Sequence, residues 1–236
     1  MTKLLETRGL TAFYGDFQAL YGVDFEISAG ETVAIIGANG AGKSTFLRAL
    51  TGLSPTRGQD IRFKGAQIAG WAGARIHRAG LAMVPEGRRL FRSLSVDENL
   101  RIGASGGRRG PWTLEAVYAL FPDLRAKARV PGTALSGGQQ QMVAIGRALM
   151  SNPELLFCDE LSLGLSPKII KDIYAALPQI RAQGTAVLVV EQDVGQALAV
   201  ADRVYCFMEG RVSLTGTPQT LTRGAIAKAY FGMETV

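Results

Sequence analysis

The chain has 236 residues, of which 47% are hydrophobic and 19% are charged, so it is neither intrinsically disordered nor too short to bury a sizeable core. Lys and Arg number 26 against 20 for Asp and Glu, an excess that suits an anionic membrane surface or a nucleotide but is too weak to indicate nucleic acid. The longest unbroken apolar run, residues 116–121, is far shorter than the about twenty residues of a membrane helix. We therefore expect no membrane-spanning helix, and Glu6 and Arg8 argue against a signal peptide.

The N-terminal part of the sequence is rich in predicted strands. Runs of β-branched and aromatic residues bounded by Gly, Asp or Pro predict strands at 4–8, 19–27, 32–36 and 59–64. The pattern then changes, and residues 95–151 are predicted to be mainly helical, with a capping box between Ser95 and Glu98 at the start. A glycine-rich surface loop is expected at 103–111.

Strands and helices alternate in the last third of the chain. Short apolar runs at 155–158, 186–190 and 204–208 are typical of strands buried on both faces of a parallel sheet. Helices are predicted between them, at about 167–181 and 193–201. The order predicts an α/β fold with an N-terminal antiparallel β lobe and an inserted helical lobe. We expect one domain, in which 1–87 and 151–236 form the α/β core with the β lobe and about 88–150 form the helical lobe.

A phosphate-binding loop follows the predicted strand 32–36. Residues 37–44 fit the pattern G-x-x-x-x-G-K-[ST], and a predicted helix begins directly after it, which is the context of a P-loop NTPase of RecA-like architecture. Backbone N–H groups of such a loop wrap a phosphate, Lys43 would hold the β- and γ-phosphates, and the Ser44 hydroxyl would bind Mg²⁺. The predicted nucleotide-binding residues of this segment are Gly37, Asn39, Gly40, Ala41, Gly42, Lys43, Ser44 and Thr45.

Two further motifs follow in the second half of the sequence. Residues 135–139, Leu-Ser-Gly-Gly-Gln, open a predicted helix, and an apolar strand at 155–158 is followed by Asp159 and Glu160. A carboxylate at the carboxyl end of a buried strand suits a metal ion, so Asp159 is a predicted Mg²⁺ ligand. Glu160 would then face the γ-phosphate and orient or deprotonate the attacking water.

In this order, the three motifs resemble those of the ATP-binding cassette (ABC) ATPases, and the resemblance covers essentially the whole chain. It implies a head-to-tail pair of cassettes, in which the signature residues of one chain act on the ATP of the other. Those residues are Ser136, Gly137, Gly138 and Gln139. The resemblance also places Tyr14 against the adenine, although the same residue also fits a core or edge-strand aromatic.

Three positions depart from the usual pattern of that family. Glu86 stands where a glutamine is usual, and it could reach Mg²⁺ or a water but cannot donate a hydrogen bond as an amide does. Gln192 replaces the usual histidine, and the single histidine, His77, lies far away in the sequence. Gln192 can bond a γ-phosphate oxygen without carrying a charge, so we expect catalysis to depend mainly on Glu160 and Lys43, with Gln192 assisting. Leu165 replaces the usual inter-subunit aspartate.

These departures are themselves similar to one subgroup, the second ATPase subunit of bacterial branched-chain (hydrophobic) amino acid importers. Segments 84–91, 162–167, 190–192 and 229–232 carry this likeness. It implies an Mg²⁺-dependent ATPase at the cytoplasmic face of the cell membrane, paired with a sister ATPase or with itself. Separate transmembrane permease subunits, and indirectly an extracellular solute-binding protein, would be its partners, without nucleic acid.

Other functions remain open from the sequence. The importer could carry urea, amides or aromatic acids instead of branched-chain amino acids. The chain could also be a soluble ABC ATPase that acts on DNA or ribosomes, or a scaffold for iron–sulfur cluster assembly. Arg88, Arg89 and Arg92 fit either a solvated loop or a surface that faces the membrane partner.

Overall fold

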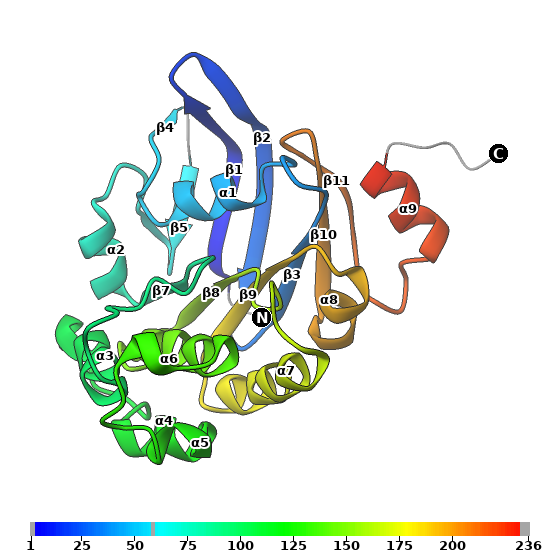
Figure 1. Ribbon diagram of the computed structural model, residues 1–236. Helices are drawn as coiled ribbons and strands as arrows, with labels where there is room; N and C mark the ends of the chain where they lie inside the picture. Colours follow the sequence, from blue (N-terminus) through cyan, green and yellow to red (C-terminus); the bar gives the residue numbers. More distant parts are fainter. Residues whose placement is uncertain (1–2, 58–59, 232–236) are drawn as a thin grey trace.

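The computed structural model describes residues 3–57 and 60–231, which form two sheets with helices around them (Figure 1). The first sheet is antiparallel, and its strands pair in the order β2-β1-β5-β6, with β4 also paired to β1. Its strands are β1 (Lys3–Tyr14), β2 (Phe17–Ser28), β4 (Thr56–Arg57), β5 (Asp60–Phe63) and β6 (Ala66–Gln67).

The second sheet has the order β11-β10-β3-β9-β8-β7. All neighbours in it are parallel except β11, which pairs antiparallel with β10 at the edge. Its strands are β3 (Thr32–Ile36), β7 (Leu81–Val84), β8 (Leu155–Asp159), β9 (Ala186–Glu191), β10 (Arg203–Met208) and β11 (Arg211–Gly216). β3, β8 and β9 are buried along their whole length, as continuous apolar runs in a parallel sheet predict.

Alternate residues of the parallel strands face two different cores. On one face, Leu155 and Phe157 of β8 join the core beneath the antiparallel sheet and α1 (Lys43–Leu50). Phe46 of α1 makes edge-on ring contacts there with Phe25 on β2 and Phe207 on β10, with centroids 5.2 and 5.4 Å apart. Helix α1 is thereby fixed between the two sheets.

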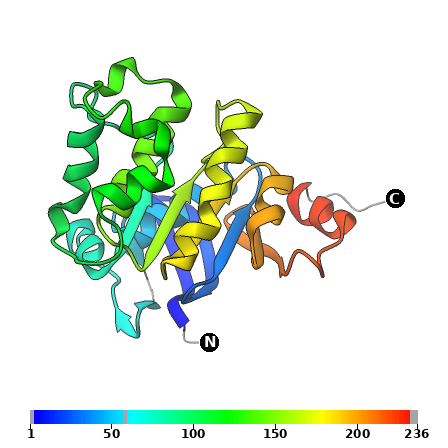
Figure 2. The same cartoon turned by 90° about the horizontal axis from the view of Figure 1, so that it is seen from below.

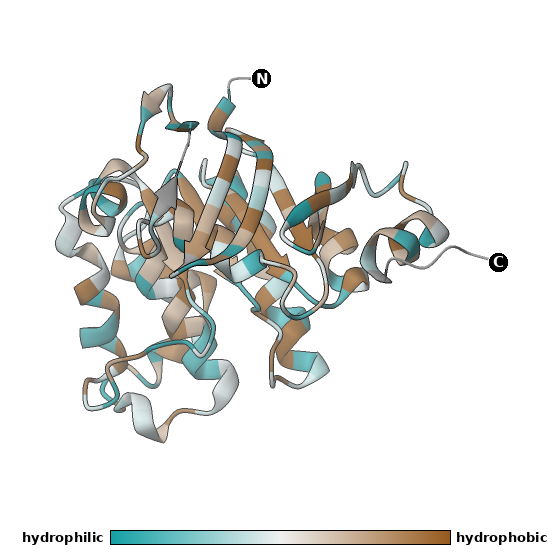
Figure 3. Ribbon diagram, turned by 90° about the horizontal axis from the view of Figure 1, so that it is seen from above, coloured by the Kyte–Doolittle hydropathy of each residue, from teal (hydrophilic) through white to brown (hydrophobic). Residues whose placement is uncertain are grey.

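The other face of the parallel sheet is covered by helices that follow β7 in the chain. Figure 2 shows α3 to α6 gathered on one side of the molecule and α8 and α9 on the opposite side, and Figure 3 shows the central strands as mainly apolar. These helices are α3 (Val96–Gly103), α4 (Leu114–Leu120), α5 (Pro122–Arg125), α6 (Gly137–Leu149), α7 (Pro167–Ala182), α8 (Val194–Val200) and α9 (Arg223–Phe231). The remaining helical turns are α2 (Gly73–Ala79), η1 (Ala104–Gly106) and η2 (Gly132–Ala134).

The predicted fold class is confirmed: an α/β core of parallel strands carries an antiparallel β lobe and a group of helices. Ser95 caps α3 and forms the predicted capping box with Glu98. The predicted glycine-rich loop at 103–111 contains the short turn η1, and the predicted strand 4–8 extends to Tyr14 as the longer β1. Within the part of the chain that the structure covers, no helix has both the length and the apolar character of a membrane span.

Candidate functional site

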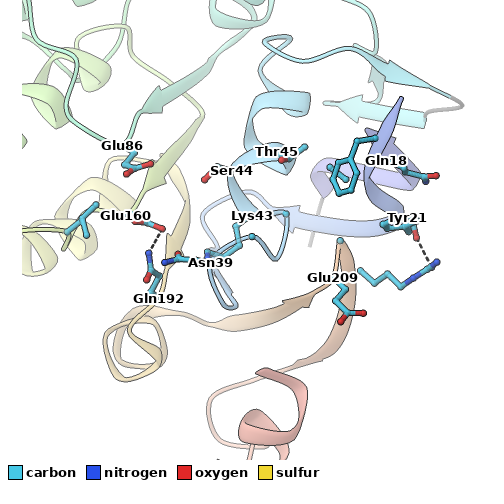
Figure 4. Close-up of a pocket in the computed structure, with 17 residues that line it drawn as sticks. Gln18, Tyr21, Asn39, Lys43, Ser44, Thr45, Glu86, Glu160, Gln192 and Glu209 are labelled. Atoms are coloured by element: carbon cyan, nitrogen blue, oxygen red, sulfur yellow. Dashed lines mark hydrogen bonds between the residues drawn. The ribbon is translucent and has the colours of Figure 1, made fainter. Parts of the chain in front are cut away.

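A cavity of about 1020 Å³ lies at the carboxyl ends of the parallel strands (Figure 4). Each of the strands β3, β7, β8, β9 and β10 is followed by a segment that lines it. In open α/β sheets this edge is where ligands bind. The lining residues are Phe17, Gln18, Ala19, Tyr21, Asn39, Gly40, Gly42, Lys43, Ser44, Thr45, Glu86, Glu160, Leu163, Gln192, Glu209, Gly210 and Arg211.

The glycine loop between β3 and α1 has a conformation that requires its glycines. A side chain at Gly37 would place its Cβ 2.4 Å from the carbonyl oxygen of Phe207. Gly42, directly before α1, has a φ of 99°, and no side chain caps the start of that helix. Uncapped N–H groups and the helix dipole together make this helix start a site for an anion such as a phosphate.

Lys43 lies within this loop and is only 5% exposed. Its Nζ donates hydrogen bonds to the carbonyl oxygens of Gly37 at 2.7 Å and of Ala38 at 3.0 Å. Burial lowers the pKa of Lys43, although the carboxylates of Glu160 and Asp159 oppose that shift. The ammonium is therefore held at the cavity wall by two neutral acceptors, which a phosphate could replace with charge-assisted bonds.

Three carboxylates, those of Asp159, Glu160 and Glu86, lie near one another beside the phosphate loop. The Ser44 hydroxyl donates to Asp159 Oδ1 at 3.4 Å, and Asp159 is 4% exposed. Burial, followed by the nearby charges of Glu160 and Glu86, raises the pKa of Asp159 from 3.8 to about 6. A buried carboxylate that resists ionisation beside two others is a place where a cation would be stabilised.

The buried Asp159 carboxyl beside the Ser44 hydroxyl and two other carboxylates fits the binding of Mg²⁺. Among residues 3–57 and 60–231, no group of three or more His, Cys, Asp or Glu side chains has the arrangement of a complete metal cage. Mg²⁺ does not need one, because it is commonly held by one or two protein oxygens together with waters and substrate phosphates. Ser44 and Asp159 lie in contact, and Glu86 lines the cavity beside them.

Glu160 and Gln192 meet inside the cavity. Gln192 Nε2 donates to Glu160 Oε1 at 2.7 Å, as Figure 4 shows. The backbone of Glu160 has a φ of 50°, in the left-handed region that a non-glycine residue seldom occupies. Such strain is concentrated at functional sites, where surrounding contacts hold it in place. Here the Glu160 N–H donates to the Val190 carbonyl at 2.9 Å.

The loop after Glu86 is also held in an unusual conformation. Arg88 and Arg89 have φ values of 66° and 47°. The Arg147 guanidinium on α6 donates to both of their carbonyl oxygens, at 3.0 and 2.8 Å. A second cavity of about 630 Å³ lies beside this loop. It is lined by Glu86, Gly87, Arg89, Leu90, Arg92, Gly132, Thr133 and Gln140.

Most of the predicted loop residues line the first cavity together with Glu86, Glu160 and Gln192. Asp159 does not line it but lies buried against Ser44, and the signature residues do not line it either. Ser136 instead caps α6, with its side chain accepting from the Gln139 N–H at 3.3 Å and its own N–H donating to Gln139 Oε1 at 3.0 Å. Gly138 packs against Ile169 of α7. Gly37 and Ala41 belong to the loop without lining the cavity. The side chain of Tyr14 lies outside the described part of the chain.

Sequence reasoning missed two groups of lining residues. Phe17, Gln18 and Tyr21 come from β2, Glu209 and Gly210 form the turn between β10 and β11, and Arg211 is the first residue of β11. This turn is joined to the phosphate loop, because the Gly210 N–H donates to the Ala41 carbonyl at 3.0 Å. The Glu-Gly dipeptide signals a turn, but nothing in the sequence indicates which loop that turn meets.

Comparison with known proteins gives the same assignment. The family model for the ABC transporter matches residues 20–162. The chain belongs to the ABC transporter family. The resemblance inferred from the motifs is thus confirmed, and the chain is an ATP-binding, ATP-hydrolysing subunit of an ABC importer.

Individual relatives extend this comparison over the whole cassette. The high-affinity branched-chain amino acid transport ATP-binding protein BraG of Pseudomonas aeruginosa is 43% identical, over 94% of this chain and 97% of its own length. The aliphatic sulfonates import ATP-binding protein SsuB of Pseudomonas putida is 39% identical, over 89% of this chain and 75% of its own length. The crystal structure of an ATP-binding cassette in its ADP conformation covers 99% of this chain with a TM-score of 0.84 and 26% identity.

Proposed function

We propose that this cassette powers the uptake of branched-chain or related hydrophobic amino acids through separate membrane subunits. The observation that carries the proposal is the end-to-end likeness to BraG, which covers 97% of that protein, against 75% for the sulfonate relative. Urea, amides, aromatic acids and sulfonates are the competing solutes.

We propose roles for the polar groups around the phosphate loop. The N–H groups at the start of α1 would bind the phosphates of ATP, and Lys43 would exchange its two carbonyl partners for the β- and γ-phosphates. Ser44 and Asp159, with Glu86 nearby, would hold Mg²⁺, which neutralises charge on the phosphate oxygens when it is bound.

Glu160 is the proposed general base. Its carboxylate is directed into the cavity, and it accepts a hydrogen bond from Gln192, which keeps it in place without giving it a proton. Gln192 would also bond a γ-phosphate oxygen. Because an amide carries no charge, Gln192 would contribute less to turnover than Glu160.

The signature residues 136–139 would act on the ATP of a partner cassette, since they do not line the cavity of their own chain. In the subgroup that the motifs resemble, that partner is a sister ATPase, and we propose such a heterodimer here. We further propose one ATPase domain over 1–236, with the helical lobe at about 88–150.

The second cavity and the loop 86–92 form the proposed contact with the permease subunits. Arg89 and Arg92 line this cavity and would also face anionic headgroups. The cassette would accordingly lie at the cytoplasmic face of the membrane as a peripheral subunit, with the solute-binding protein acting on it only through the permease.

Affinity isolation of the tagged chain from its native cells in a mild detergent tests the complex. We expect two multi-spanning proteins and a second ABC ATPase to copurify. Recovery of soluble proteins, ribosomes or nucleic acid alone would contradict the transport proposal.

Uptake by cells that lack the gene tests the solute. We expect loss of leucine, isoleucine and valine uptake, restored by the native chain and not by the Glu160→Gln variant. Unchanged uptake of these amino acids, with loss of uptake of urea, an amide or a sulfonate, would contradict the proposed solute and keep the importer.

A further inference from the structure

Glu191, the last residue of β9, is a buried carboxylate for which the proposed mechanism has no role. It is 1% exposed and does not line the cavity. Its Oε1 accepts the Tyr174 hydroxyl at 2.6 Å and the Ser162 N–H at 3.2 Å, and its Oε2 accepts the Ser162 hydroxyl at 2.7 Å. Both oxygens are thus occupied by groups from two other segments, the loop after β8 and the helix α7.

The hydrogen bonds of the Glu191 side chain lie just beyond the point where the main-chain pairing of β8 and β9 ends. Asp159 is the last residue of β8 to pair with β9, opposite Val190. The next N–H, that of Glu160, donates to the Val190 carbonyl at 2.9 Å, and the chain then turns away through the left-handed conformation of Glu160. Beyond this turn, the Glu191 carboxylate accepts the N–H of Ser162 in place of a main-chain carbonyl.

Three consecutive residues, the last two of β9 and the one that follows it, therefore form hydrogen bonds to the same turn. The Val190 carbonyl holds the backbone of Glu160, the Glu191 carboxylate holds Ser162, and the Gln192 amide holds the carboxylate of Glu160. Tyr174 fixes the Glu191 carboxylate from the side of α7. Burial and the charge of Glu191 raise the pKa of Tyr174, so this hydroxyl keeps the proton that it donates.

We propose that Glu191 is a positioning residue for ATP hydrolysis: by anchoring Ser162, it holds the strained turn that directs the Glu160 carboxylate into the cavity. The strain at Glu160 has to be balanced by contacts on both sides of the turn. The Val190 carbonyl supplies the contact on one side, and the Glu191–Ser162 bonds supply it on the other. This inference rests on the proposed role of Glu160 as the general base.

The geometry predicts which variants keep the anchor. In Glu191→Gln, the amide oxygen can accept from the Ser162 N–H and the Tyr174 hydroxyl, while the amide NH₂ can donate to the Ser162 oxygen, so every partner is retained. Glu191→Leu removes all three acceptor contacts. Ser162→Ala and Tyr174→Phe each remove one hydroxyl and are milder changes that keep the fold.

The test is the steady-state ATP hydrolysis of the full chain together with the partners with which it copurifies. We expect kcat to remain within about threefold of the native value in Glu191→Gln and to fall at least about tenfold in Glu191→Leu, because a misplaced catalytic group is costly. Ser162→Ala and Tyr174→Phe should lower kcat about threefold or more, with the KM for ATP unchanged.

Tyr118→Phe is the matched control, because Tyr118 is also a buried tyrosine that donates to a carboxylate, the half-buried Asp97, at 3.3 Å, but does so within the group of helices α3–α6. We expect its kcat to be unchanged and its thermal midpoint to fall as little as that of Tyr174→Phe. A native kcat in both Ser162→Ala and Tyr174→Phe, an equal loss in Tyr118→Phe, or a raised KM at constant kcat would overturn the inference. If Glu160→Gln itself turns over normally, the proposed mechanism fails; if only Glu160→Gln is inactive, the role of Glu191 alone fails.

Discussion

Substitutions of single cavity residues should separate nucleotide binding from hydrolysis. We expect Glu160→Gln to bind ATP as the native chain does but to lower kcat by about 100-fold or more, because the amide cannot accept a proton from water. Gln192→Ala should lower kcat less, since Gln192 supports Glu160 and does not itself take the proton. Fluorescent-nucleotide binding and steady-state hydrolysis measure the two effects.

Glu209→Gln is the control for that pair, because Glu209 is another carboxylate that lines the same cavity, from the β10–β11 turn, and has no role in the proposed mechanism. It should remain within about twofold of the native kcat. Near-normal turnover in Glu160→Gln would remove Glu160 as the base, and a larger loss in Gln192→Ala would show that Gln192 contributes more than a neutral amide should.

The raised pKa of Asp159 makes stability depend on pH in a defined direction. Its pKa in the folded chain, about 6, lies above its ordinary value of 3.8. The protonated carboxyl therefore contributes its whole stabilising effect below about pH 4, and this contribution to the free energy of unfolding is lost as the pH rises through about 6. Without Mg²⁺ or nucleotide, Asp159→Asn should therefore raise the thermal midpoint by a few degrees at pH 7.5, reflecting at most about 3 kcal/mol, and by less at pH 5.

Asp172→Asn, which makes the same substitution at an exposed position on α7, is the control variant. Thermal denaturation of both variants and the native chain at the two pH values checks this prediction. A gain in Asp159→Asn that is equal at pH 5 and pH 7.5 would argue against a titrating carboxyl at this position.

At the scale of elements, the β10–β11 turn supports the phosphate loop. Gly210 has a φ of 72°, and a Cβ there would lie 2.3 Å from the Ala19 carbonyl oxygen. Its N–H donates to Ala41, and its carbonyl accepts from the Tyr21 N–H at 2.9 Å. We expect Gly210→Ala to raise the Kd for ATP several-fold and to destabilise the chain by more than the about 1–2 kcal/mol of left-handed strain alone.

Gly184→Ala gives the matched measurement of strain without overlap, because Gly184 has a φ of 88° and no heavy atom within 4 Å of its would-be Cβ. Chemical denaturation of both variants separates the cost of backbone strain from the cost of steric overlap, and isothermal titration with ATP measures the effect on nucleotide affinity. Equal losses of stability, with native ATP affinity in Gly210→Ala, would show that the turn does not hold the loop.

The elements around the cavity differ in how well the sequence predicts them. The phosphate loop, the signature and the strand before Asp159 were predicted because each is a local pattern with its chemistry written in consecutive residues. Phe17, Tyr21 and Arg211 were not, since they reach the cavity only when β2 and the β10–β11 turn pack beside the loop. α2 and β11 were also missed, because β11 is half-exposed at the sheet edge and α2 is short and buries only Ile76.

At the scale of the whole molecule, the separation of the signature from the cavity predicts hydrolysis between two cassettes. Ser136 and Ser95 each form a capping box, on α6 and on α3. Ser136→Ala and Ser95→Ala should therefore lose similar stability, about 1 kcal/mol. Only Ser136→Ala should also lower the kcat of the assembled complex, with ATP binding to its own chain unchanged.

Hydrolysis by the purified complex and nucleotide binding by the isolated chain test this comparison. An equal loss of kcat in both variants would indicate that the capping boxes act through stability alone. Weaker ATP binding by the isolated Ser136→Ala chain would place the signature on its own nucleotide, against the arrangement that its distance from the cavity predicts.

The left-handed backbone at Glu160 also has an evolutionary consequence. Glycine would occupy that conformation without strain, and asparagine with less of it, so either would make the chain more stable while removing the carboxylate. With Glu160 as the proposed general base, selection for turnover would oppose this gain in stability. In a lineage that no longer needs transport, position 160 should be among the first to change. A glycine at this position would then indicate a cassette that keeps its fold but no longer hydrolyses ATP.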